Sequence, residues 1–149
     1  DFNTEPLYNL EKIKTILPHR DPFLFIDEIR EIGEDFIIGV KFVKQKEDYF
    51  KGHFPNKPLM PGVLQIETMA QVGGILILNT VKKPKDYLTY FMKIENAKFK
   101  QKVIPKDILI FRLELITPIR RGLCHMHGRG FVNGKIVVEA DLLAQISKK

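Results

Sequence analysis

The amino-acid sequence predicts an α+β fold in which one antiparallel β-sheet wraps around a single apolar helix. Residues 63–78 are mostly apolar on every side, which is typical of a helix that the rest of the fold encloses. Six other stretches are rich in β-branched and aromatic residues and are bounded by turn residues, two before this helix and four after it. One six-stranded sheet packed on one long helix accounts for all of them.

The first element is expected to be a short helix. Apolar residues recur at helical spacing between Leu7 and Leu17, with Asn9 as a possible cap and Pro18 as the end of the helix. Residues 19–22 then form a turn. Within it His19 has the chemistry of a ligand or a base, but its charged neighbours favour a turn residue in a polar cluster.

Two strands follow and are expected to pair as an antiparallel hairpin. Residues 23–32 begin apolar and then alternate, and residues 36–43 are rich in strand-forming residues. Between them, residues 33–35 have the composition of a turn. A polar stretch over residues 44–48 then leads into the segment that carries His53.

Four strands are expected after the central helix and the polar loop at residues 79–86. Pro- or Gly-containing turns separate these strands, which span residues 87–99, 108–116, 123–132 and 135–146. Asn133-Gly134 joins the last two, and this dipeptide is a strong signal for a two-residue hairpin because both residues tolerate positive φ.

Composition favours an ordinary globular chain, and residues 1–149 are expected to form one domain with a proper core. The single cysteine, Cys124, excludes an intrachain disulfide and favours a reducing compartment. The net charge of +6 suggests an acidic partner. Nucleic acid is not expected, because the sequence has no helix-turn-helix, zinc-finger or base-stacking signature. The apolar run is too short to span a membrane, so no membrane partner is expected either.

Residues 51–71 concentrate the candidate chemistry. They hold an imidazole at His53, a turn that ends in Pro61-Gly62, and a carboxyl group at Glu67 on the apolar helix. A buried carboxyl group stays protonated near neutral pH and can act as a general acid. Gln71 lies one helical turn further on and can hydrogen-bond it. The alternative is that Glu67 is a satisfied core polar group and His53 a loop residue bonded to backbone.

The spacing of these two residues favours a site built by two chains. Glu67 lies about 9 Å along the helix from Pro61, at ~1.5 Å per residue, whereas His53 precedes the turn. A His and a Glu that act on one small substrate are therefore expected to come from two copies of the chain.

Other motifs carry less weight. His125 and His127 share a strand face and form at most half of a metal site, so an exposed strand face is the preferred interpretation. Cys124 and His125 do not form a nucleophile pair, because neighbours in a strand point to opposite faces. There is no phosphate-binding glycine loop, nucleophile elbow or HExxH motif.

Several motifs together resemble the 3-hydroxyacyl-[acyl carrier protein] dehydratases of the FabZ type. The resemblance runs from about residue 10 to residue 146 and rests on Leu17-Pro-His-Arg20, Gly52-His-Phe-Pro55, Met60-Pro-Gly-Val-Leu64, Glu67-x-Met-Ala-Gln71, Ala97-Lys-Phe-Lys100, Arg120-Arg-Gly122 and Val132-Asn-Gly134. It implies the hot-dog fold, a long helix wrapped by an antiparallel sheet. The implied reaction is syn elimination of water from a (3R)-hydroxyacyl thioester, giving a trans-2-enoyl thioester.

The resemblance also assigns roles to residues. His53 is the expected base and Glu67 the expected acid, while the Gly62 N–H at the helix N-terminus is expected to stabilise the enolate oxygen. Further substrate-binding residues are Gln71, Leu78, Tyr90 as gate of the acyl tunnel, and Phe99. The acidic carrier protein is expected to contact Lys100, Arg120 and Arg121. No metal or redox cofactor is implied.

By the same resemblance, the chain is expected to form a homodimer with shared active sites that assembles as a trimer of dimers. Glu67, where isomerising relatives carry Asp, implies dehydration without isomerisation, and Asp21 departs from the aromatic residue common in bacterial members. The expected location is a bacterial cytoplasm, or a plastid-type organelle if a targeting segment was removed. A hot-dog acyl thioesterase and a non-catalytic acyl-binding subunit remain as alternatives.

Overall fold

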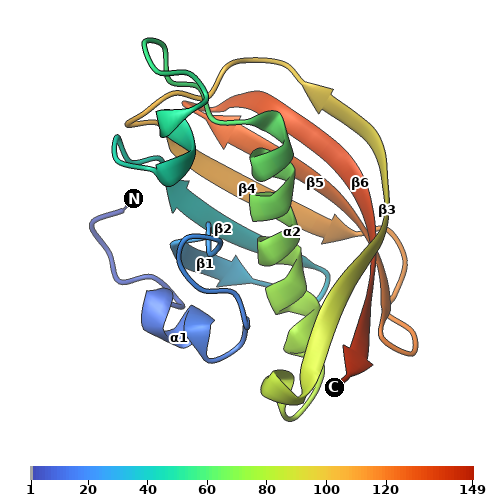
Figure 1. Ribbon diagram of the computed structural model, residues 1–149. Helices are drawn as coiled ribbons and strands as arrows, with labels where there is room; N and C mark the ends of the chain where they lie inside the picture. The colour runs from blue at the N-terminus through green and yellow to red at the C-terminus, as the bar shows by residue number, and fades with distance from the viewer. Residues whose placement is uncertain (1) are drawn as a thin grey trace.

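The computed structural model describes residues 2–149 and shows a long helix held against a six-stranded sheet (Figure 1). In chain order the elements are α1 (Leu10–Lys14), β1 (Glu28–Ile32), β2 (Phe36–Phe42), a 3₁₀ turn (Asp48–Lys51), α2 (Gly62–Leu78), a second 3₁₀ turn (Pro84–Asp86), β3 (Tyr87–Phe99), β4 (Ile108–Leu115), β5 (Leu123–Val132) and β6 (Lys135–Lys148). The predicted order of two strands, a helix and four strands is confirmed.

Every pair of neighbouring strands is antiparallel, in the order β1-β2-β4-β5-β6-β3. Strand β3 therefore lies at one edge of the sheet and β1 at the other. The predicted hairpins β1–β2 and β5–β6 are both present. Asn133 and Gly134 adopt φ values of 51° and 77° in the second hairpin, as a two-residue turn of this type requires.

Helix α2 lies close to the sheet because glycines line the contact. A Cβ atom added to Gly73 would lie 2.5 Å from Met126 Cε, and one added to Gly128 would lie 2.5 Å from Met69 Sδ. Larger residues at these positions would push the helix outward. All residues from 68 to 78 are buried, which confirms the prediction of an enclosed helix.

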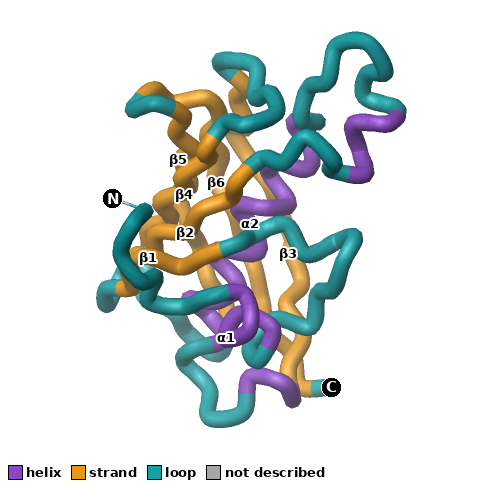
Figure 2. Tube along the Cα trace, turned by 90° about the vertical axis from the view of Figure 1, so that its left-hand side faces the viewer, coloured by secondary structure: helices purple, strands orange, loops and turns teal. Residues whose placement is uncertain are grey.

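The first helix is shorter than predicted. Tyr8 pairs with Ile29 through two backbone hydrogen bonds of 3.0 Å, so the chain before α1 is extended and joins the edge of the sheet (Figure 2). The Asn9 cap is confirmed, because its side chain accepts the Lys12 N–H at 3.0 Å. Helix α1 ends at Lys14, before the Pro18 that was expected to stop it.

The prediction of a strand over residues 23–32 is wrong for its first half. Strand β1 begins at Glu28, because the buried Gln71 side chain takes the hydrogen bonds that a neighbouring strand would otherwise make. Its Oε1 accepts the Phe25 N–H and its Nε2 donates to the Phe23 carbonyl, both at 2.9 Å. Residues 23–25 are thus attached to the helix.

Candidate active site

His53 lines a cavity of about 540 Å³ at the N-terminus of α2. The cavity is bounded by the turn before the helix, the first helical residues and the segment that follows β3. The His53 N–H donates to the Tyr49 carbonyl at 3.1 Å, and the His53 carbonyl accepts from the Leu59 N–H at 3.0 Å. Both ends of the residue are therefore fixed by backbone contacts.

The orientation of the His53 ring leaves one nitrogen free. Nδ1 lies 2.9 Å from the Leu59 carbonyl oxygen, and a carbonyl only accepts, so Nδ1 carries the proton in the neutral ring. The remaining nitrogen, Nε2, then holds an unshared electron pair. Phe54 stacks on the ring with centroids 4.2 Å apart. This arrangement suits a general base.

Gly62 shares the His53 cavity and begins α2. Its N–H finds no acceptor in the part of the chain that the structure describes, as is usual for the first residues of a helix. Because the N-terminal end of a helix also carries partial positive charge, this amide can stabilise a developing oxyanion. Phe99 packs over it, and a Cβ on residue 62 would lie 2.7 Å from Phe99 Cε1.

Glu67 lies further along α2 and lines a different cavity, of about 330 Å³. Its side chain is 27% exposed, so the expectation of a fully buried carboxyl group is wrong for the single chain. The cause is position: Glu67 lies on the side of α2 that faces this cavity, whose walls include the edge strand β3. Gln71 Nε2 donates to Glu67 Oε2 at 3.1 Å, which confirms the predicted contact between the two residues.

His53 and Glu67 do not share a cavity within one chain. No residue among those described lines both the His53 cavity and the Glu67 cavity. Strand β3 passes both, with Thr89 and Phe91 at the Glu67 cavity and Phe99 at the His53 cavity. A chain by itself therefore presents two halves of a possible acid–base pair.

His19 is the site residue that the sequence interpretation missed. Its Nε2 lies 3.6 Å from Glu67 Oε2, and the ring lines the Glu67 cavity. Burial lowers the pKa of His19, opposed by the nearby Glu67 and reinforced by the Arg20 charge. Its place in Leu17-Pro-His-Arg20, a motif of the resemblance, was the available signal.

The other predicted substrate residues fall into two groups. Tyr90 and Phe99 lie on β3 with 53% and 52% of their surface exposed. Gln71 and Leu78 are buried in α2, and Leu78 belongs to the hydrophobic core of the single chain. The exposed pair is free to contact a ligand or a second chain.

The three predicted carrier-protein residues do not gather in one place. Lys100 follows β3, lines the His53 cavity and pairs with Glu139 at 3.4 Å. Arg120 and Arg121 lie in the turn before β5, whose Gly122 carbonyl accepts the Ile146 N–H. The Lys100 N–H donates to the Val137 carbonyl, near the start of β6, whereas the turn of the two arginines contacts Ile146 near the end of β6.

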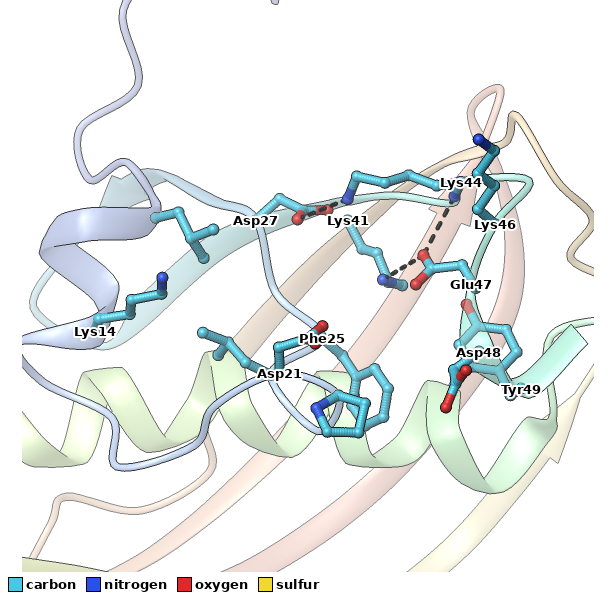
Figure 3. A pocket seen from close by; sticks show the side chains of 13 residues that line it. Lys14, Asp21, Phe25, Asp27, Lys41, Lys44, Lys46, Glu47, Asp48 and Tyr49 are labelled. Atoms are coloured by element: carbon cyan, nitrogen blue, oxygen red, sulfur yellow. Dashed lines mark hydrogen bonds and ion pairs between the residues drawn. The ribbon is translucent and has the colours of Figure 1, made fainter.

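A third cavity, of about 550 Å³, is lined in part by the segment before His53 (Figure 3). The Lys41 ammonium group, only 2% exposed, points into it and pairs with Glu47 at 2.8 Å. Burial, together with the negative charges of Glu47 and Asp27, raises the pKa of Tyr49. The Tyr49 carbonyl accepts the His53 N–H, so the segment that carries this ion pair also holds the backbone of His53.

The motifs that carry less weight in the sequence lie on β5, where His125 and His127 are half-buried rather than on a fully exposed face. His127 Nδ1 lies 2.6 Å from Asp141 Oδ1, and the hydrogen bonds from Asn96 and His127 lower the pKa of Asp141. Cys124 is buried, and its burial raises the thiol pKa to about 12. Residues 2–149 contain no group of three or more His, Cys, Asp or Glu side chains placed to hold a metal ion. None of their helices has the length and apolar character needed to cross a membrane.

A helix enclosed by a six-stranded antiparallel sheet defines the hot-dog class of proteins. The dehydratase heterocomplex ApeI:P from Xenorhabdus doucetiae superposes with a TM-score of 0.78 at 17% identity, covering 92% of this chain and 91% of that chain. A thioesterase from Haemophilus influenzae gives a TM-score of 0.66 at 14% identity, over 95% and 92% of the two chains. At these identities the likeness is one of fold alone.

Sequence comparison identifies the family within that class. A model of the FabA-like domain matches residues 17–141. The 3-hydroxyacyl-[acyl-carrier-protein] dehydratase FabZ of Halalkalibacterium halodurans is 43% identical over 94% of this chain and 99% of its own length. The bifunctional enzyme LpxC/FabZ of Bacteroides thetaiotaomicron is 53% identical, and this chain spans 32% of it. The chain belongs to the FabZ family of 3-hydroxyacyl-[acyl-carrier-protein] dehydratases, which are hydro-lyases of fatty acid synthesis.

Proposed function

We propose that this chain dehydrates (3R)-hydroxyacyl thioesters of acyl carrier protein, with His53 as base and Glu67 as acid. The observation that carries the proposal is the free Nε2 of His53 in one cavity with the Gly62 N–H. The base and the oxyanion donor thus line one cavity, while the acid lies in a second cavity along the same helix. Membership of the FabZ family supplies the reaction to which these groups are suited.

The groups account for each step of the elimination. His53 Nε2 takes the proton from the carbon next to the thioester carbonyl, and the electron pair of that C–H bond forms the new double bond. The Gly62 N–H donates to the carbonyl oxygen as negative charge develops there. The C–O bond at the third carbon breaks, and the departing hydroxyl takes the proton of Glu67 and leaves as water.

A second copy of the chain completes the site in this proposal. The outer edge of β3 has no strand partner within residues 2–149, and an unpaired edge strand favours pairing with another chain. Three of its apolar side chains, Met92, Ile94 and Phe99, are each more than half exposed, as is Val63 at the start of α2. A homodimer joined here would cover both β3 and the cavities beside it, bringing His53 of one chain toward Glu67 of the other.

The partners and context belong to the same proposal. Lys100 lines the His53 cavity, where its positive charge would favour the approach of a thioester carried by an acidic protein. Arg120 and Arg121 would serve the same partner only if a neighbouring chain brings them near that cavity. Residues 1–149 would act as one dehydratase domain in a bacterial cytoplasm. Because the chain spans about a third of its LpxC/FabZ relatives, the activity of any longer protein is also a proposal.

The test follows the absorbance of the enoyl thioester with 3-hydroxybutyryl and crotonyl thioesters of acyl carrier protein. We expect His53→Ala and Glu67→Gln to lose about 10²–10⁴-fold in kcat while keeping the melting temperature of the parent chain. His127→Leu, which removes a histidine of β5 that lines neither the His53 cavity nor the Glu67 cavity, serves as the control. Release of free thiol would establish a thioesterase, and ligand binding without turnover a binding subunit.

Mixing the two inactive variants tests the shared site. In a mixed dimer, one site combines wild-type His53 from one chain with wild-type Glu67 from the other. After unfolding and refolding together, a 1:1 mixture is expected to regain about a quarter of wild-type activity, since half of the dimers are mixed and each has one intact site. A mixture that stays inactive would place both groups in sites made by one chain.

A further inference from the structure

We propose that His19 is a positioning residue for Glu67, and that it determines which carboxyl oxygen carries the transferred proton. The proposal rests on the proposed function and extends it to a residue outside the His–Glu pair. His19 belongs to the segment between α1 and β1, whereas Glu67 lies on α2, so their contact is made only by the fold.

The contact geometry selects one oxygen of Glu67. Gln71 Nε2 donates to Oε2 at 3.1 Å, and His19 Nε2 approaches the same Oε2 at 3.6 Å. Oε2 already accepts the Gln71 N–H, and once the His19 N–H closes on it as well, both of its lone pairs are used and it has little capacity to hold a proton. The acidic proton is therefore directed to Oε1, the oxygen left for the substrate. The 3.6 Å separation is longer than a hydrogen bond and is of the kind that shortens when a substrate binds.

Both donors are held in place by other groups. Gln71 is fixed through its bonds to the backbone of Phe23 and Phe25. The carbonyl of His19 accepts from Arg20 Nη1 at 2.7 Å, and Arg20 also bonds the Leu17 and Lys14 carbonyls. The Arg20 hydrogen bonds consequently fix the loop that carries the His19 ring, and a positioning group requires such a fixed backbone.

The His19 ring is suited to this role when it is neutral. Burial lowers the pKa of His19, so at neutral pH the ring is uncharged and its Nε2–H is able to donate to Glu67 once the two groups come closer. The charged groups that act on the ring are Glu67 from α2 and Arg20 from its own segment. The cavity-lining residues of β3, Thr89 and Phe91, do not titrate in this range. His19 Nδ1 is buried and has no hydrogen-bond partner among the described residues, which leaves Nε2 as the ring nitrogen that faces a polar group, Glu67 Oε2.

The first measurement compares two replacements of His19 by steady-state kinetics. His19→Leu removes the donor, and we expect kcat to fall about 10- to 100-fold with KM nearly unchanged, the value of a hydrogen bond to a charged group. His19→Gln keeps an N–H near the position of Nε2 and is expected to restore most of the loss. His127→Leu removes another histidine that pairs with a carboxylate and should leave kcat unchanged.

The second measurement does not depend on activity. The pKa of His19 is followed by NMR in the wild type and in Glu67→Gln. Glu67 raises the pKa of His19, so its removal is expected to lower that pKa further. A titration and ring chemical shifts of His19 that are both unchanged would show that the two side chains do not interact and would overturn the proposal, even if His19→Leu failed to fold.

The outcomes separate this proposal from the proposed function. If folded Glu67→Gln keeps wild-type kcat, the acid has been assigned wrongly and the proposed mechanism fails. If Glu67→Gln is inactive but folded His19→Leu has wild-type kcat, only the positioning role is overturned. If His19→Gln is as impaired as His19→Leu although both are folded, the N–H donor is not what matters and the role is structural.

Discussion

At the residue scale, the proposed chemistry depends on hydrogen bonds that orient two titratable side chains. The Leu59 carbonyl sets the tautomer of His53 and frees Nε2, while Gln71 occupies Oε2 of Glu67. Glu67 is less enclosed than an apolar helix suggests, because it lines a cavity of about 330 Å³ and keeps 27% of its side chain exposed. In the single chain, the Glu67 side chain is therefore set for its proposed role by the hydrogen bond that orients it more than by burial.

Gly62 illustrates how little room surrounds the proposed oxyanion donor. Gly62→Ala keeps the N–H but places a Cβ atom 2.7 Å from Phe99 Cε1, so the exposed Phe99 ring must move. We expect kcat/KM to fall roughly tenfold, equivalent to about 1.4 kcal/mol, with little loss of stability. Steady-state kinetics and thermal unfolding measure the two effects. An Ala variant with unchanged kcat/KM would mean that the glycine is not needed for access to the amide.

The reactivity of the Cys124 thiol tests the interpretation that Cys124 is a core residue. Burial raises its thiol pKa to about 12, so the thiolate is scarce below that pH and the folded chain should react slowly with iodoacetamide at pH 8. Modification, followed by mass spectrometry, is expected to accelerate sharply in denaturant. Rapid modification of the folded chain with loss of activity would instead reveal an accessible, functional thiol.

At the element scale, the segment before His53 is held by a buried ion pair between Lys41 of β2 and Glu47. Lys41→Met leaves the partly buried Glu47 carboxylate without its ammonium partner, although the Lys44 N–H still donates to it, so we expect a loss toward the lower end of the about 3–5 kcal/mol typical of a broken buried pair. The double variant with Glu47→Met is expected to recover much of this loss. Chemical denaturation measures the free energy of unfolding in each variant.

The control for this ion pair is Lys51→Met, because the Lys51–Asp48 pair lies at the surface with 81% and 66% of the side chains exposed. An exposed pair contributes little, so we expect a change within about 0.5 kcal/mol. Equal effects of Lys41→Met and Lys51→Met would show that burial of the first pair does not stabilise the segment.

At the scale of the whole molecule, the proposed site is complete only when a second chain pairs with the exposed edge strand β3. Ile94→Lys places a charge among the exposed apolar residues of β3 and should prevent a second chain from pairing there. We expect a folded monomer with less than about a tenth of wild-type kcat, since removing one of two cooperating groups costs at least this much. Light scattering after size-exclusion chromatography measures the mass.

Ile116→Lys is the matched control for the edge strand. Ile116 is 48% exposed, close to the 51% of Ile94, but it lies in the connection between β4 and β5. It should leave the oligomeric state and activity unchanged. An Ile94→Lys chain that stays dimeric and active would locate the interface, and the completion of the site, elsewhere.

The sequence by itself determined the parts of this protein that depend on local patterns. The apolar run of α2, the alternation along β4 and the turn at Asn133-Gly134 each predict their element, because periodicity and turn chemistry are properties of neighbouring residues. The motifs around His53 and Glu67 likewise indicated the family before any contact was known.

Tertiary structure alone decided which distant groups meet. Tyr8 pairs with β1 and shortens α1, and Gln71 replaces a strand partner for residues 23–25. His19, an ordinary turn residue in its local context, reaches Glu67 only because its loop packs beside α2. Such contacts join residues that are far apart in the sequence, so the spacing of neighbouring residues does not predict them. They depend on the packing of the whole chain around its central helix.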